Sequence, residues 1–394
     1  MHRNVIGYFN DEPVYAIFGG ESGYHTEGDV LVDETADGVD LNTIWTEVQA
    51  VLAAYNNERS TLASLLSYRT TLSADPVPQS LSYDSFEEAS EFGVPNALRE
   101  APEVLLAGYD FKDFDKATRF TWKFLRDADS RQVQSVVNRI LEADNRLVTG
   151  TILDRLFNPQ ERLNEFGAKV FGLWTGTDGF GPLPHLGKQF PTDTCHYLPT
   201  GASVIDSQDI ENSMRLVLDK GFGRQPGSQL LILANPHEGE KIQTWKAGEQ
   251  SRAKEGSETE GPVAAHDFVR SSTAPAYLTQ DNIIGKIPPG EYNGLPVEGS
   301  YGPAWLIQSE FIPEGYLTVV ASGGPNSTLN PVAMREHIKP QYQGLRVIPG
   351  QQPAYPITGS FFARGFGTGV RYRGAAVCLQ VTTDADYTAP TIDR

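Results

Sequence analysis

The stretch GYDFKDFDK at residues 108–116 alternates aromatic with charged side chains and continues, through RFTWKFL at residues 119–125, into one long helical pattern. Aromatic residues at every second position of 119–125 predict a strand there. Aromatic side chains can anchor in a neighbour's pocket while charges set the register, so this arm is typical of a subunit that contacts copies of itself. The predicted contact residues are Tyr109, Phe111, Lys112, Phe114, Lys116 and Arg119. The alternative is an ordinary β-hairpin that packs on its own domain.

The long helical pattern begins at Asp129 or Ser130 and repeats apolar side chains three and four residues apart as far as Phe157. Asn158-Pro159 ends it, because the residue before a proline disfavours the helical conformation. Similar patterns predict helices at residues 41–55, 61–67 and 207–218, with a further helix starting at Asn235-Pro236. Apolar runs predict strands at residues 229–234, 304–307 and 316–321, and a strand pair or one bent strand at 370–381. The order helix, strand, helix predicts an α/β layer.

Composition and charge limit the class of protein. The 394 residues carry a net charge of −18, which disfavours tight sequence-independent binding of DNA, because Lys and Arg must neutralise its phosphates. Two cysteines, Cys195 and Cys378, are too few for a disulfide framework and favour a reducing compartment. The sequence shows neither a signal peptide nor an apolar run long enough to span a bilayer. We therefore expect a soluble protein of intracellular origin.

The charge is unevenly distributed along the chain. Residues 1–60 contain eleven acidic side chains, and only Arg3 and Arg59 oppose them. Residues 337–383 contain no acidic side chain. Their basic residues are Lys339, Arg346, Arg364, Arg371 and Arg373. Either the two regions meet, within a subunit or between subunits, or both are solvated surfaces that never touch.

Taken in order, these elements resemble the major capsid proteins of tailed bacteriophages, which have the α+β Hong Kong 97-type fold. The resemblance is carried by the long helix, by the run from Ile205 to Pro236, and by segments 302–307, 312–320, 330–336 and 370–381. It implies an N-terminal arm at 1–71, an extended loop at 72–118, a peripheral domain at 119–200 with a spine helix at 130–157, an axial domain at 201–325, and the rest of the peripheral domain with a C-terminal strand at 326–394. A Gly/Pro-rich stretch at 171–200 and a charged insertion at about 238–297 depart from the family pattern.

The resemblance implies a structural subunit, not an enzyme, with no cofactor and no metal ion. Copies are expected to self-assemble as hexamers and pentamers into an icosahedral head that encloses double-stranded DNA without sequence-specific binding. Scaffolding, portal and decoration proteins are expected partners, and no membrane is involved. The expected location is the capsid of the virion, assembled in the host bacterial cytoplasm. Two alternatives stay open, an encapsulin-type nanocompartment shell and a cytosolic α/β enzyme whose site the sequence does not reveal.

The enzyme motifs that the sequence offers are incomplete. The glycines of GPLPHLGKQ at 181–189 are one residue too far apart for a phosphate-binding loop, and no Ser or Thr follows the lysine. Gly365-Phe366-Gly367-Thr368-Gly369 predicts a tight turn or a bulge. Cys195 and His196 are adjacent, an arrangement that rarely binds one metal ion, and His185 is the sole further candidate nearby. His266-Asp267 could orient an imidazole, but no nucleophile elbow accompanies it.

Overall fold

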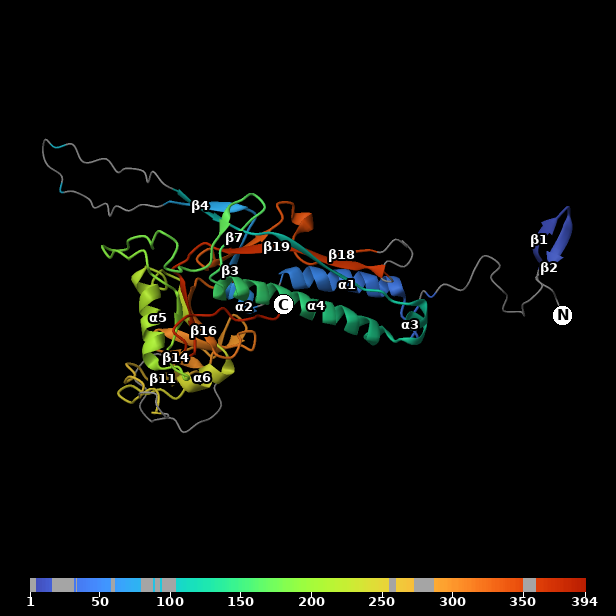
Figure 1. Ribbon diagram of the computed structural model, residues 1–394. Coiled ribbons are helices and arrows are strands. Elements are labelled where there is room, and N and C mark those ends of the chain that lie inside the picture. Colours follow the sequence, from blue (N-terminus) through green and yellow to red (C-terminus); the bar gives the residue numbers. More distant parts are fainter. Residues whose placement is uncertain are drawn as a thin grey trace. The chain divides into compact units, whose positions relative to one another are not determined.

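The computed structural model describes residues 5–15, 32, 34–57, 61–78, 88, 93, 104–254, 260–272, 287–349 and 359–394. The chain divides into two compact units. The first contains Met1–Val51, Lys116–Arg139 and Val347–Phe362, and the second contains Leu52–Asp115, Ile140–Arg346 and Ala363–Arg394. The helices are α1 (Leu41–Asn57), α2 (Thr61–Leu66), α3 (Trp122–Asp127), α4 (Ser130–Phe157), α5 (Ser207–Asp219), α6 (Pro236–Ile242) and the 3-10 helix η1 (Pro340–Tyr342) (Figure 1).

A seven-stranded sheet organises the second unit, with the strand order β11-β14-β15-β10-β16-β20-β9. Its strands are β9 (Tyr197–Pro199), β10 (Gln229–Ala234), β11 (Phe268–Arg270), β14 (Gly299–Tyr301), β15 (Ala304–Gln308), β16 (Tyr316–Ser322) and β20 (Ala376–Gln380). β10 pairs parallel with β15 and antiparallel with β16, so Ile232 lies between Leu306 and Val319. A strand in this central position is buried on both faces, which explains why β10 is a continuous apolar run.

Helices cover both faces of this sheet. Leu231 and Leu233 point into one core, which also contains α2 and the C-terminal part of α4. Leu230, Ile232 and Ala234 point into a second core, which also contains side chains of α5 and α6. The alternation follows from the two-residue period of a strand. In Figure 1, α5 and α6 lie beside the sheet strands β14 and β16.

A smaller sheet has the order β18-β19-β17-β3, and β6 also pairs with β19. Its strands are β3 (Ser67–Thr70), β6 (Lys112–Ala117), β17 (Val332–Glu336), β18 (Arg346–Ile348) and β19 (Phe361–Val370). In β17, Arg335 lies opposite Gly367 of β19 and Thr70 of β3. Four two-stranded pairs complete the described structure: β1 (Val5–Phe9) with β2 (Glu12–Tyr15), β4 (Ala74–Pro78) with β5 (Val104–Gly108), β7 (Arg162–Leu163) with β8 (Lys169–Val170), and β12 (Glu291–Tyr292) with β13 (Leu295–Pro296).

The predicted helices at 130–157, 41–55, 61–67 and 207–218 are confirmed within a few residues by α4, α1, α2 and α5. The helix after Asn235 is confirmed as well, since the Asn235 side chain accepts the His237 amide at 3.0 Å. The N-cap of α5 is Asp206, and Asp206 and Asp209 form a reciprocal capping box. The strands predicted at 229–234, 304–307 and 316–321 are confirmed by β10, β15 and β16.

The strand predicted at 119–125 is wrong, because residues 122–127 form the helix α3. The Thr121 side chain caps this helix by accepting the Phe124 amide at 3.1 Å. Phe120 and Phe124, four residues apart, stack with their ring centroids 5.6 Å apart. Phe120 precedes the N-cap, so its ring packs back against the first turn of α3 as in a hydrophobic staple.

The segment predicted as a strand pair or one bent strand at 370–381 is divided between the two sheets. Val370 ends β19 of the smaller sheet, and Ala376 begins β20 of the seven-stranded sheet. The charged insertion at 238–297 is also more integrated than a surface decoration, because Trp245 and Val297 are buried and β11 extends the large sheet. Residues 255–259 and 273–286 of this insertion lie outside the described residues.

Asn330 joins α2, β3 and the turn after β16 through one buried side chain. Its amide nitrogen donates to the carbonyl oxygens of Ser64, Ser67 and Gly324 at 3.0–3.1 Å. Its amide oxygen accepts from the Gly323 amide at 2.9 Å. We expect Asn330→Ala to lower the free energy of unfolding by about 3 kcal/mol, because several buried backbone groups lose their partner. Denaturant unfolding compared with Asn212→Ala, at an exposed position of α5, measures this; equal stability of the two variants would contradict it.

Candidate functional site

The segment that follows β5 crosses the strand β19 at a stripe of glycines. A Cβ atom on Gly367 would overlap the carbonyl oxygen of Asp110, and one on Gly369 would lie 2.6 Å from the carbonyl oxygen of Gly108. The Asp110 amide donates to the Thr368 carbonyl at 3.2 Å, and the Asp110 carboxylate accepts the Thr368 amide at 2.5 Å. The turn or bulge predicted at 365–369 is therefore wrong. These residues lie inside a strand whose glycines let a second backbone approach closely.

Tyr109 is fully buried in its own chain. Its hydroxyl lies 3.2 Å from the Tyr68 hydroxyl and donates to the Asp75 carboxylate at 3.5 Å. Arg371 forms an ion pair with Asp75 at 2.7 Å. Burial raises the pKa of both Tyr109 and Tyr68, so both remain neutral hydrogen-bonding groups. A side chain without exposed surface cannot anchor in a neighbour, so Tyr109 fixes the base of the β4–β5 loop instead.

The structure places the other predicted contact residues in two classes. Phe111 and Phe114 are half-buried on their own sheet, with the Phe114 and Phe366 rings 5.5 Å apart. Lys112, Lys116 and Arg119 are exposed. Contact of any of these side chains with a neighbouring subunit stays a prediction. The spacing of aromatic and charged residues did not distinguish the side chains that pack inside from those that face solvent.

Arginines of the basic C-terminal region pair with carboxylates that the sequence did not single out. Arg364 donates to Asp144 at 2.6 Å, and the Tyr55 hydroxyl donates to the same carboxylate at 2.9 Å. Arg373 pairs with Asp178 at 2.5 Å. Together with the Arg371–Asp75 pair, these contacts engage partners outside residues 1–60. The acidic N-terminal region is therefore not what neutralises these three arginines.

A pocket of about 360 Å³ opens beside the base of the β4–β5 loop. Val77 and Leu105 of the loop line it together with Trp174, Phe222 and Lys220. The Lys220 amine lies 4.8 Å from the centroid of the Phe190 ring and donates to a helix carbonyl. Burial lowers the pKa of Lys220 to about 8. The pocket is therefore largely apolar, with Lys220, Arg371 and Arg373 among its lining residues. Both arginines are held in ion pairs with carboxylates, so the composition favours packing over acid–base chemistry.

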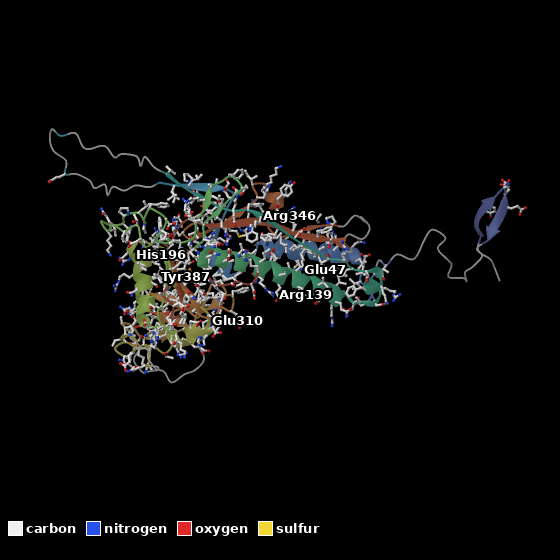
Figure 2. All side chains as sticks on the ribbon, viewed as in Figure 1. Glu47, Arg139, His196, Glu310, Arg346 and Tyr387 are labelled. Carbon is white, nitrogen blue, oxygen red and sulfur yellow. The ribbon has the colours of Figure 1, made fainter. Side chains whose placement is uncertain are left out.

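The proposed metal and catalytic alternatives gain no support from geometry. His196 is buried, its Nδ1 lies 2.6 Å from the Ala376 carbonyl, and burial lowers its pKa to about 3 (Figure 2). The Cys195 thiol lies 3.2 Å from the Tyr197 carbonyl. Within the described residues, no group of three or more His, Cys, Asp or Glu side chains is arranged to hold a metal ion. His196 and Cys195 thus act as packing residues.

Within the part of the chain that the structure describes, no helix is both long and apolar enough to cross a membrane. No protein-family model matches the chain, and no curated protein does either. Among solved structures, a chain from Mycobacterium phage Patience is 37% identical over 93% of this chain and 96% of its own, with a TM-score of 0.68.

Two further solved structures show weaker similarity. The capsid of the native GTA particle is 13% identical, covering 93% of this chain and 100% of its own, with a TM-score of 0.44. The SrpI encapsulin from Synechococcus elongatus PCC 7942 is 12% identical, covering 87% of this chain and 98% of its own, with a TM-score of 0.41. Of these three similarities, the one to the phage Patience chain is strong enough to indicate a family.

Proposed function

Because the chain belongs to the major capsid proteins of tailed bacteriophages with the Hong Kong 97-type fold, we propose that its copies assemble as hexamers and pentamers. The protein is a structural subunit of an icosahedral phage head, and its place is the capsid of the virion. The similarity of 37% over 93% of the chain carries this conclusion. Fold alone would not, since function must be argued from more than architecture.

We propose that the domains of the subunit have the roles of the family pattern. We assign the N-terminal arm to residues 1–71, the extended loop to 72–118, the peripheral domain to 119–200 and 326–394, and the axial domain to 201–325. The length of α4 supports its role as the spine of the peripheral domain. Five strands of the seven-stranded sheet, β10, β11, β14, β15 and β16, lie within residues 201–325 and support a rigid axial core, which β9 and β20 extend from the ranges assigned to the peripheral domain. The glycine stripe of β19 and the buried Tyr109 support a fixed base for the loop, which suits an arm that bears on a neighbour.

Lys112, Lys116 and Arg119 are the side chains that we propose to contact a neighbouring subunit, together with the exposed edges of Phe111 and Phe114. Their exposure supports this, because exposed cations beside half-buried aromatics are common at interface rims. A shell that encloses DNA does not have to bind it tightly. The net charge of −18 is consistent with a subunit that encloses DNA without sequence-specific contacts. Scaffolding, portal and decoration proteins, and assembly in the bacterial cytoplasm, complete the proposal.

Negative-stain electron microscopy of the purified protein, with size-exclusion chromatography of the same sample, tests this function. We expect icosahedral shells or capsomer-sized rings. A lone 43.2 kDa species that persists after coexpression with the neighbouring phage genes would overturn the proposal. Nucleic acid in particles isolated from infected cells would support the phage head, whereas a copurifying enzyme would indicate an encapsulin-type compartment.

A further inference from the structure

Six side chains of the second unit form a continuous stack beside the point where residues 108–110 cross β19. In spatial order they are Phe166, Arg335, Phe111, His337, Tyr342 and Arg346, which we call the aromatic–cation ladder. The Arg335 guanidinium lies 5.8 Å from the Phe166 ring centroid and 5.3 Å from that of Phe111. These distances are within the range of cation–π attraction.

The second half of the ladder continues the alternation of rings and cations. The His337 ring lies 6.5 Å from that of Phe111 and 4.9 Å from that of Tyr342, and the Arg346 guanidinium lies 5.1 Å from the Tyr342 centroid. His337 Nδ1 accepts the Lys339 amide at 3.0 Å, which leaves the proton on Nε2 as a donor. The stack therefore combines aromatic faces with hydrogen-bond donors.

This ladder is exposed where a partner could reach it. Phe166 is 72% exposed, Tyr342 38%, and the adjoining Ile338 73%. Apolar and aromatic side chains gathered on a surface in this way mark an interaction site more often than isolated ones do.

The charges of the ladder identify the chemistry of the partner. Arg335 is neutralised by Glu165 at 2.6 Å. In the described part of the chain, by contrast, neither Lys339 nor Arg346 has an ion pair, and the buried Nε of Arg346 has no hydrogen-bond acceptor. The other basic residues of this region, Arg364, Arg371 and Arg373, all have carboxylate partners, so two uncompensated cations remain on one aromatic surface.

The N-terminal hairpin β1–β2 has the complementary composition. Among the described residues its strands pair with each other and with no other strand, and a lone two-stranded hairpin is marginally stable in water. Asn10 and Asp11 form its turn with φ values of 49° and 61°. Asp11 and Glu12 are exposed there, beside the 73% exposed Tyr8. The hairpin therefore presents two carboxylates and an aromatic ring and needs a surface to pack on.

We propose that the aromatic–cation ladder of one subunit binds the β1–β2 hairpin of a second copy, with Lys339 and Arg346 pairing with Asp11 and Glu12. This inference rests on the proposed self-assembly and names one of its interfaces. Charge pairs fix the register of such a contact, and the rings provide the buried area.

A charge exchange tests the contact in the full chain. Lys339→Glu with Arg346→Glu, or Asp11→Lys with Glu12→Lys, should each lower the fraction of protein in shells about tenfold, the change expected for losing one well-placed charge contact. All four substitutions in one chain should restore the fraction, because each copy then supplies both reversed partners. Arg224→Glu, at an exposed arginine that has no ion pair with any described residue, is the matched control and should assemble normally. Failure of the four-fold variant to exceed both pairs would overturn the proposal.

A zero-length carbodiimide cross-link gives an independent readout in unmutated shells. Shells are assembled from equal amounts of isotopically light and heavy chains, and cross-linked peptides are identified by mass spectrometry. We expect Lys339 linked to Asp11 or Glu12 in light–heavy pairs. Two results would overturn the inference while leaving self-assembly intact. One is that Lys339 is linked only within single chains, and the other is that its light–heavy links reach only acidic residues other than Asp11 and Glu12. Absence of shells from the unmutated protein would instead overturn the proposed function.

Discussion

Replacing Gly367 by alanine should destabilise the subunit by about 3 kcal/mol and abolish shell formation, although alanine adds a single methyl group. The new Cβ would overlap the carbonyl oxygen of Asp110, which is backbone and cannot swing aside. The backbone φ of Gly367 is outside the left-handed region, so alanine costs nothing through its own conformation. The expected effect is therefore purely one of space between β19 and the arm.

The loss of stability in Gly367→Ala should appear first in the segment around Asp110 that crosses β19. To admit the methyl group, the Asp110 segment must withdraw and give up its two hydrogen bonds with Thr368. Denaturant unfolding measures the loss of stability, and hydrogen exchange should show faster exchange at the Asp110 and Thr368 amides. Gly359→Ala is the matched control, because a Cβ there meets no atom within 4 Å. If Gly367→Ala and Gly359→Ala unfold and assemble alike, the close crossing is not a structural requirement.

Elements governed by local periodicity could be predicted from the sequence. The apolar repeat of α4, the Asn235-Pro236 helix start and the apolar run of β10 each depend on a few neighbouring residues. The segment 119–125 shows the limit of this approach, since an aromatic residue at every second position also fits a short helix that Thr121 caps. In this segment, the capping residue Thr121 was a better guide to the local structure than the alternation of aromatic residues.

The candidate site could not be predicted from the sequence in the same way, because it depends on contacts between distant segments. Nothing near Tyr109 in the sequence shows that Tyr68 and Asp75 enclose it, and the ladder joins residues 111, 166 and 335–346 through packing alone. One signal was available: glycines at 365, 367 and 369 repeat with the period of a strand. Three glycines on one face of a strand indicate a backbone that passes close by, which is what the arm does.

Arg373 should be the other position at which one substitution has a large effect. The residue is 5% exposed, and its guanidinium donates to the carbonyl oxygens of Gly172 and Leu173 at 3.0 Å and pairs with Asp178. The Trp174 ring centroid lies 4.1 Å away. This arginine thereby ties the Gly/Pro-rich segment after α4 to the turn between β19 and β20. The rings of Phe171, Trp174 and Phe180 in that segment surround the same guanidinium.

We expect Arg373→Leu to lower the free energy of unfolding at pH 7 by about 3–5 kcal/mol, because it leaves the buried Asp178 carboxylate without its cation. Arg373→Leu combined with Asp178→Asn should recover part of the loss, since the unpaired charge is then absent. Denaturant unfolding of the wild type and the two variants measures both effects. Equal stability of the single and double variants would show that the packing of Arg373, and not its charge, holds the segment.

The pH dependence of the free energy of unfolding further distinguishes a role of the Arg373 charge from a role of its packing. Burial by itself would raise the pKa of the Asp178 carboxyl, but Arg373 and the Thr175 hydrogen bonds outweigh it and hold the pKa below its usual range. A lowered folded-state pKa means that the pair stabilises the wild type above about pH 4 and that this contribution is lost as the pH falls further. In Arg373→Leu the Thr175 hydrogen bonds remain but the arginine is absent, so the pKa of the Asp178 carboxyl rises and protonation relieves the penalty. The stability difference between wild type and variant should therefore narrow as the pH falls from 7 toward 4, and a difference independent of pH would contradict the ion-pair account.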